Sequence, residues 1–198
     1  MKQFTNRYML LYSLALVAVS AVVLSVTAVA LKPREERNRQ IEQQQMILKT
    51  IGLECAKNET AQAYDRHITE ADCDGQTYYR YDCDGRQGII LPLHGTGLWG
   101  PIWGYLALDC SDNVVGAVFD HKGETPGLGG EIATDKFAQR FVGKCMDEHP
   151  IYLIKNADKK NPYQVDAISG GTMTSNGVTQ MLEEGYFDYV KIKENTAK

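Results

Sequence analysis

Glycine and hydroxyl residues gather in one short stretch near the end of the chain, residues 166–177. The stretch reads Asp-Ala-Ile-Ser-Gly-Gly-Thr-Met-Thr-Ser-Asn-Gly. Gly170 and Gly171 allow the backbone to turn sharply, and the hydroxyl residues after them are typical of the start of a helix. Because the first N–H groups of a helix lack intrahelical partners, such a start attracts a phosphate group. The competing interpretation, which the local pattern alone favours, is an ordinary helix cap by Thr172 or Thr174.

A second glycine-rich stretch lies at residues 123–130 and reads Gly-Glu-Thr-Pro-Gly-Leu-Gly-Gly. Its glycines and its proline predict a tightly shaped, irregular loop. Leu128 is the one large apolar residue in it, and such a side chain suits contact with a planar ring. The alternative is an ordinary surface loop, because the stretch lacks the G-x-G-x-x-G order and the strand-to-helix context of a dinucleotide-binding fold.

A third stretch, residues 95–108, brings Trp99, Trp103 and Tyr105 close to glycine turns. Aromatic residues of this kind usually belong to the core. The alternative is that some of them face a cofactor or a partner.

The remaining candidate ligands do not predict a metal site. The five cysteines include no C-x-x-C pair and the four histidines are isolated, whereas zinc needs about four closely organised ligands. The cysteines are interpreted as structural thiols, with one disulfide as the alternative in an exported domain. Asp-Cys-Asp-Gly occurs at 72–75 and again at 82–85. Because the late glutamate of a calcium loop is missing, both copies predict turns.

Two further classes of function find no support in the residues. A net charge of −4 gives no electrostatic reason to expect nucleic acid, since phosphate binding needs clustered Lys and Arg. No convincing pair of nucleophile and base is present, and no catalytic residue is predicted.

The elements that must position these stretches begin with an apolar segment. Residues 8–31 carry no charged side chain, and a helix of this length, rising about 1.5 Å per residue, spans the roughly 30 Å hydrocarbon core of a membrane. A cleaved signal peptide is the alternative, although its apolar region is shorter, about 7–15 residues. We predict a short N-terminal segment at 1–7, a transmembrane anchor at 8–31, a polar stalk helix at 32–52 with Pro33 in its first turn, and one domain at 53–198.

Stretches rich in β-branched and aromatic residues, bounded by turn residues, predict a series of strands. They lie at residues 77–81, 87–93, 101–109, 113–120, 151–155 and 163–168. One helix is predicted at 136–142, with Phe137, Phe141 and Val142 on one face, and another runs from near Met173 towards Tyr186. The order predicts an α+β domain with a mainly antiparallel sheet and flanking helices.

The three stretches, in this order behind an N-terminal anchor, resemble the C subunit of the sodium-translocating NADH:quinone oxidoreductase over almost the whole chain. In that family a D-x-x-S-G-A-T-x-T-S motif receives FMN through a phosphoester to its threonine. The matching threonine is Thr172, and Gly171 stands where the family usually has alanine. The family's E-T-P-G-L-G loop is matched by residues 124–129, and its G-L-W and G-x-L-A-L segments are matched by 97–99 and 104–108.

The resemblance implies a flavoprotein with FMN bonded covalently to Thr172. The residues expected around the cofactor are Ser169, Gly170, Gly171 and Thr174 of the motif and Glu124, Thr125, Leu128 and Gly129 of the loop. Lys155 ends a predicted strand just before the motif, and its charge is expected to favour a negatively charged flavin. His121, beside the loop, is the weaker candidate for that role.

The resemblance also implies partners and a location. The expected partners are the other subunits of a membrane NADH:quinone reductase, which hold the NADH and quinone sites, and a flavin transferase that recognises residues 166–172. The flavin domain is expected outside the inner, cytoplasmic membrane of a bacterium. The basic residues at 32–39 predict the opposite side by the positive-inside rule, and we follow the resemblance. The alternatives are the G subunit of the ferredoxin-linked Rnf complex and a non-redox membrane anchor or assembly subunit.

Overall fold

The computed structural model describes residues 6–196, so most of the predicted segment 1–7 lies outside the described residues. Its contacts divide the chain into two units, residues 1–42 and 43–198. The first helix, α1 (Asn6–Thr50), contributes to both units. The second unit holds all the other elements and all the candidate site residues.

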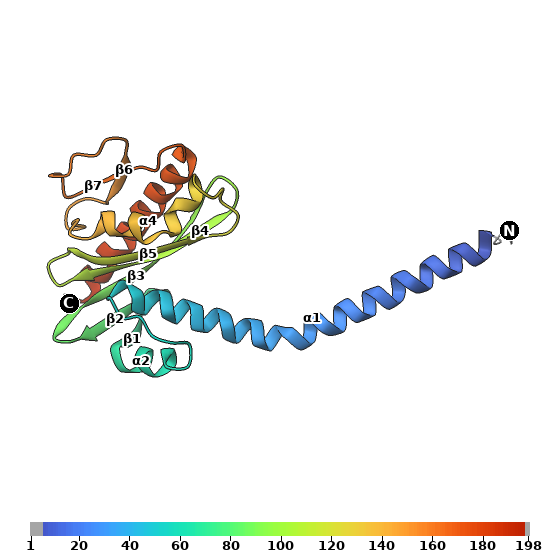
Figure 1. Cartoon of the computed structure of the whole chain (residues 1–198). Coiled ribbons are helices and arrows are strands. Elements are labelled where there is room, and N and C mark those ends of the chain that lie inside the picture. The colour runs from blue at the N-terminus through green and yellow to red at the C-terminus, as the bar shows by residue number, and fades with distance from the viewer. Residues whose placement is uncertain (1–5, 197–198) are drawn as a thin grey trace. The chain divides into compact units, whose positions relative to one another are not determined.

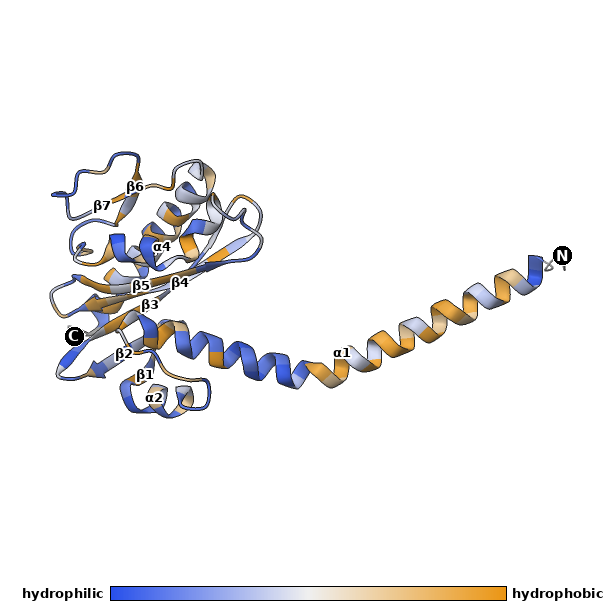
Figure 2. Ribbon diagram, viewed as in Figure 1, coloured by the Kyte–Doolittle hydropathy of each residue, from blue (hydrophilic) through white to orange (hydrophobic). Residues whose placement is uncertain are grey.

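The first unit contains the apolar part of α1. Figure 2 shows hydrophobic residues along this part of the helix and hydrophilic ones after it. Ser13, Ser20 and Thr27 donate their hydroxyl hydrogens to the carbonyl four residues earlier, so these hydroxyls need no water. Within residues 6–196, α1 is the one helix long and apolar enough to cross a membrane.

The stalk at 32–52, predicted as a helix of its own with Pro33 in its first turn, is not a separate helix. Pro33 lies inside α1, which continues without a break to Thr50. A proline inside a helix removes one hydrogen bond and costs about 3 kcal/mol. Its neighbours include Leu31, Lys32 and Arg34, which are good helix formers, and the helix continues through it. The predicted end near Gly52 is confirmed, because Gly52 has a φ of 82° and terminates the helix as glycine commonly does.

The second unit is built on a five-stranded antiparallel sheet with the strand order β1-β2-β3-β4-β5 (Figure 1). The strands are β1 (Ile68–Cys73), β2 (Gln76–Cys83), β3 (Arg86–Thr96), β4 (Pro101–Asp109) and β5 (Val114–His121). The two predicted Asp-Gly turns are confirmed, since Asp74, Gly75, Asp84 and Gly85 all have positive φ. Tight antiparallel hairpins favour this conformation.

Two elements of this unit were missed by the sequence patterns. The helix α2 (Thr60–His67) has eight residues and buries only Thr60 and Tyr64, so it contains few apolar residues from which a helix could be predicted. The strand β1 reads Ile-Thr-Glu-Ala-Asp-Cys and lies at the edge of the sheet. Charged residues protect an edge strand from pairing with other chains. They also leave β1 without the β-branched and aromatic pattern by which a strand is predicted.

After the sheet the chain forms short elements and one long helix. They are η1 (Gly129–Ala133), α3 (Asp135–Ala138), η2 (Gln139–Phe141), β6 (Tyr152–Ile154), β7 (Gln164–Asp166) and α4 (Thr172–Thr196). β6 and β7 pair in parallel. The predicted helix at 136–142 is instead a turn of α-helix followed by a 3₁₀ turn, and Val142 lies beyond it and is exposed. α4 runs ten residues past the predicted Tyr186.

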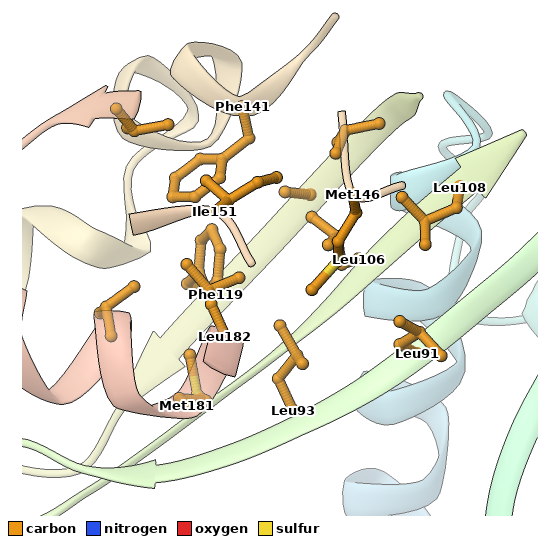
Figure 3. Close-up of a cluster of buried hydrophobic side chains, with 14 of the residues drawn as sticks. Leu91, Leu93, Leu106, Leu108, Phe119, Phe141, Met146, Ile151, Met181 and Leu182 are labelled. Carbon is orange, nitrogen blue, oxygen red and sulfur yellow. The ribbon is translucent and has the colours of Figure 1, made fainter. Parts of the chain in front are cut away.

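Both faces of the sheet are covered. One face packs against α4, α3 and η2 in a core of aliphatic and aromatic side chains, many of which Figure 3 draws. Within it Phe119 of β5 contacts Phe137 and Phe141, with ring centroids 5.5 and 4.9 Å apart. The opposite face packs against the end of α1, through Ile47 and Leu48, and against α2. All five cysteines are free.

Candidate functional site

The start of α4 follows directly from the Gly-Gly-Thr sequence. Gly170 has a φ of 76°, a conformation that glycine adopts without strain. The carbonyl of Gly171 accepts the first helical hydrogen bond, from Ser175 N at 2.8 Å, so Gly171 occupies the capping position. Thr172 is therefore the first helical residue and not the cap. The simple capping interpretation of Thr172 and Thr174 does not hold.

The three hydroxyl residues of the first turn have different environments. Thr174 and Ser175 are buried; Thr174 donates to Glu124 Oε2 at 2.6 Å, and Ser175 Oγ accepts from Ile168 N at 3.0 Å. Thr172 is exposed, and its hydroxyl has no hydrogen-bond partner among the described residues. Of the three hydroxyls in the first turn of α4, the fold thus leaves that of Thr172 accessible to a reagent, at the end of a 25-residue helix where N–H groups are unpaired.

Glu124 joins three parts of the chain that are distant in sequence. Its side chain is 4% exposed, and while Oε2 accepts from Thr174, Oε1 accepts from the backbone N–H of Trp99 at 2.8 Å. Burial raises the pKa of Glu124, but the hydrogen bonds from Thr174 and Trp99 outweigh it, so that the pKa lies below its ordinary value. The carboxylate is consequently ionised at neutral pH and holds α4, the 123–130 loop and the β3–β4 turn together.

Two glycines make room for this carboxylate. A Cβ on Gly97 would lie 2.5 Å from Glu124 Oε1, and one on Gly129 would lie 2.2 Å from Oε2 and 2.4 Å from Thr174 Oγ1. Real Cβ atoms do not come so close to other atoms. Gly177 plays a related part further along α4, where a Cβ would lie 2.2 Å from the carbonyl oxygen of Thr96. The backbone of α4 can therefore lie directly against the end of β3.

The loop at 123–130 is ordered by its own backbone. The carbonyl of Thr125 accepts from Leu128 N at 3.1 Å and from Gly130 N at 2.9 Å. Pro126 and Gly127, the latter with a φ of 75°, occupy the central positions in the order typical of a type II turn. His121 supports the loop, since its Nδ1 accepts from Glu124 N at 3.2 Å. The Thr125 side chain is exposed.

Large apolar side chains are exposed around this junction. Leu128 is 43% exposed, and its Cδ2 lies only 2.7 Å from where a Cβ on Gly170 would be. Trp99 is 69% exposed at the β3–β4 turn, and Met173, beside Thr172, is 60% exposed. Trp103 is half-buried and Tyr105 is buried, as the default assignment to the core expects. A planar apolar group bonded near Thr172 would find such a surface favourable.

The structure brings most of the predicted site residues together, with Lys155 the least directly connected. Ser169 and Gly170 form the exposed turn before Thr172, and Gly129 and Glu124 meet Thr174. Lys155 is exposed and follows β6, whose Ile154 carbonyl accepts from Ala167 N at 3.0 Å. The sequence patterns did not predict that the backbone N–H of Trp99 donates a hydrogen bond to Glu124. The glycines on both sides of that tryptophan were the one available signal.

The part of the chain that contains this site is similar to known proteins. Residues 97–186 match the FMN-binding domain family. The C subunit of the Na⁺-translocating NADH-quinone reductase from Pseudomonas aeruginosa is 30% identical over 87% of this chain and 88% of its own length. The chain belongs to this C-subunit family. The Neisseria meningitidis C subunit is 39% identical, over 58% of this chain and 49% of its own length, so that match spans about half of the relative.

A solved structure supports membership of the C-subunit family at the level of the fold. The crystal structure of the C subunit from Parabacteroides distasonis has a TM-score of 0.73 and 32% identity, and the match covers 81% of this chain and 96% of that one. The predicted α+β fold, with an apolar N-terminal helix, an antiparallel sheet and flanking helices, is confirmed.

Proposed function

We propose that this chain carries FMN in phosphoester linkage to Thr172 and serves as an electron-carrying subunit of a sodium-translocating NADH:quinone reductase. The observation that carries the proposal is the exposed, unpartnered hydroxyl of Thr172 beside two buried and engaged hydroxyls, those of Thr174 and Ser175. Membership of the C-subunit family and the match to the FMN-binding domain support it.

The residues present fit such a cofactor. A Cβ on Gly170 would lie 2.7 Å from Leu128 Cδ2, so this glycine lets the turn before Thr172 lie close to Leu128. A phosphate on the Thr172 hydroxyl would be stabilised by the unpaired N–H groups of the first turn. Leu128, and with it Trp99, would offer apolar contact to the ring, while Thr125 offers a hydroxyl. When bound, FMN supplies the redox chemistry, and the protein sets its position and potential.

Glu124 has an indirect part in this arrangement. Its two oxygens are already engaged by Thr174 and Trp99, so it positions the loop and the helix that face the cofactor. The ionised carboxylate also places a negative charge beneath the first turn of α4.

The attachment is tested by intact-mass measurement of the full chain made together with a flavin transferase. One FMN adduct is expected on the wild type and none on Thr172→Ala. Ser111→Ala is the control, because Ser111 is an exposed hydroxyl outside the 166–172 motif, and it should keep the adduct. An undiminished adduct on Thr172→Ala would refute the assignment. A denatured gel band of the wild type without flavin fluorescence would instead favour a non-redox anchor or assembly role.

The proposed partners are the other subunits of the reductase, with the flavin transferase needed only for maturation. Affinity purification of the tagged chain from its own membranes should recover NADH:quinone reductase subunits. Recovery of ferredoxin-linked subunits would favour the Rnf alternative.

We place the flavin domain on the external side of the membrane. Cys110 provides the test, because it is a free and exposed thiol. A membrane-impermeant maleimide added to spheroplasts should label the wild type and leave Cys110→Ser much less labelled. Labelling only after lysis would place the domain in the cytoplasm, as the basic residues at 32–39 predict.

A further inference from the structure

A cationic cavity lies in the second unit, between the end of η2 and the connection from β6 to β7. Its volume is about 270 Å³, and its lining includes Arg140, Lys144 and Lys159 together with Gln164 and Asp166. None of these five residues belongs to the junction around Glu124. Three cationic side chains thus line this hollow although the chain as a whole has a net charge of −4.

The guanidinium group of Arg140 is held in place at this cavity. It donates to the main-chain oxygen of Asp166 at 2.8 Å and lies over the ring of Phe137, 5.4 Å from its centroid. The side chain is half-buried. An arginine has five N–H donors, and the bond to Asp166 uses one of them. The group is therefore oriented in advance, with donors left over.

Lys144 is fixed in a similar way. Its ammonium group donates to the carbonyl of Asn161 at 2.9 Å, and the side chain is half-buried. Lys159 is exposed on the β6–β7 connection. In the described part of the chain, none of these three cations lies within ion-pair distance of a carboxylate. Their charges are thus not neutralised by the protein itself.

The other polar groups of the lining are already engaged. The Gln164 amide donates to Tyr152 Oη at 2.7 Å and accepts from Asp158 N at 3.0 Å. Asp166 Oδ1 accepts from Ala157 N at 2.8 Å. Three cationic groups thus face one carboxylate, which is held by the backbone.

We propose that this cavity is a binding site for a compact phosphate group, either a free diphosphate or the phosphate of a nucleotide. A fixed guanidinium beside two ammonium groups suits oxygens that carry more than one negative charge on one small group. A ligand with a single carboxylate would neutralise only one of the three positive charges. A phosphate dianion or a diphosphate is small enough for the volume and matches the charge.

The experiment is isothermal titration calorimetry on the full chain in detergent, prepared without the flavin transferase and therefore without FMN. Sodium pyrophosphate should bind with a Kd of about 1 mM or tighter, more weakly as sodium chloride is raised. Lys159→Gln should weaken binding about two- to fivefold, the range expected for one exposed charge. Lys160→Gln is the matched control, because Lys160 is the adjacent exposed lysine and does not line the cavity.

A second variant probes the shape of the site. Arg140→Lys keeps the charge but removes the planar fork, and it should weaken pyrophosphate binding while thermal unfolding shows the chain still folded. AMP and inorganic phosphate form a further pair: tighter binding of AMP would identify a nucleotide as the source of the phosphate, and equal binding a free phosphate group.

Three results would overturn the proposal. One is the absence of binding heat up to about 5 mM pyrophosphate, well above the expected Kd. Another is an equal affinity of the Lys159→Gln and Lys160→Gln variants. The third is binding of hexaglutamate without binding of pyrophosphate, which would make the cavity a docking site for an acidic peptide.

Discussion

Thr174 and Glu124 are fifty positions apart in the sequence, and their side chains meet in a buried hydrogen bond of 2.6 Å. The bond joins the first turn of α4 to the glycine-rich loop. The other carboxylate oxygen accepts a hydrogen bond from the backbone of Trp99, which joins the β3–β4 turn to the same group. The candidate flavin site is therefore assembled around one ionised carboxylate that itself stays covered by protein.

Glu124→Gln should lower the free energy of unfolding by about 1–2 kcal/mol, because both hydrogen bonds lose their charge assistance. The melting temperature of the full chain in detergent should fall by about 2–8 °C. Glu183→Gln is the control, since Glu183 is exposed on α4, and it should leave the melting temperature within about 1 °C of the wild type. Equal effects of the two changes would show that the Glu124 carboxylate contributes no special stability.

Lowering the pH should remove the contribution of Glu124 to the free energy of unfolding. Its pKa in the folded chain lies below the ordinary value of 4.5, so the unfolded chain takes up the proton first as the pH falls. The contribution is fully present above about pH 5 and declines as the pH falls through the folded pKa. Denaturant unfolding of the wild type and Glu124→Gln at pH 3 to 7 measures this. A stability difference between the two that stays constant down to pH 3 would contradict the assignment.

Gly129→Ala should lower the free energy of unfolding much more than Gly130→Ala. A Cβ on Gly129 would lie 2.2 Å from Glu124 Oε2, whereas one on Gly130 would come no closer than 3.1 Å to the carbonyl oxygen of Thr125. Overpacking of this kind costs about 2–3 kcal/mol at the first position and about 1 kcal/mol or less at the second. Denaturant midpoints of the two variants compare them directly, and similar midpoints would mean that the carboxylate can move aside.

Leu128→Ala should change the flavin without removing it. Leu128 is 43% exposed, so its loss should cost less than about 1 kcal/mol of stability. The absorption spectrum or the midpoint potential should shift, while the intact mass still includes FMN. Val142→Ala is the comparison, because Val142 is another exposed apolar residue, 53% exposed, outside the loop. An unchanged spectrum and potential in Leu128→Ala would show that the ring lies elsewhere.

Lys155→Met tests the charge proposed to act on the flavin. The change keeps most of the side-chain stem and removes the positive charge, so it should lower the midpoint potential and leave the FMN adduct intact. A redox titration followed by absorbance measures this. Lys136→Met, at an exposed lysine of α3, is the control. A wild-type potential in Lys155→Met would remove Lys155 from the site.

Several features could be predicted from the sequence because their causes are local. The hairpin turns at Asp74-Gly75 and Asp84-Gly85 depend on residues that tolerate positive φ. The strand at 101–109 has the predicted bounds, since it is rich in apolar and aromatic residues and starts at a proline after a glycine turn. The helix start near Thr172 follows from two glycines and the hydroxyl residues after them. Each of these causes acts within a few residues.

Other features could not be predicted because their causes are distant. The strand β1 pairs with β2 although its own residues are largely polar, and the parallel pairing of β6 with β7 depends on the chain between them. The three-residue contact of Phe119, Phe137 and Phe141 forms only when β5 and α3 pack together. Val142 was assigned to that face and is exposed, because the helix ends before it.

The sequence by itself determined that a helix begins near Thr172 behind a glycine turn, and that Glu124 lies in a tight loop. Only the tertiary structure decided which hydroxyl in the first turn of that helix is accessible. Thr174 faces inward because the loop brings Glu124 beneath it, and Gly97 and Gly129 leave the space that this carboxylate fills. A buried charge is stable only when its hydrogen bonds are made, and those partners come from three separate segments. Local sequence patterns do not specify hydrogen bonds between segments so distant in the sequence.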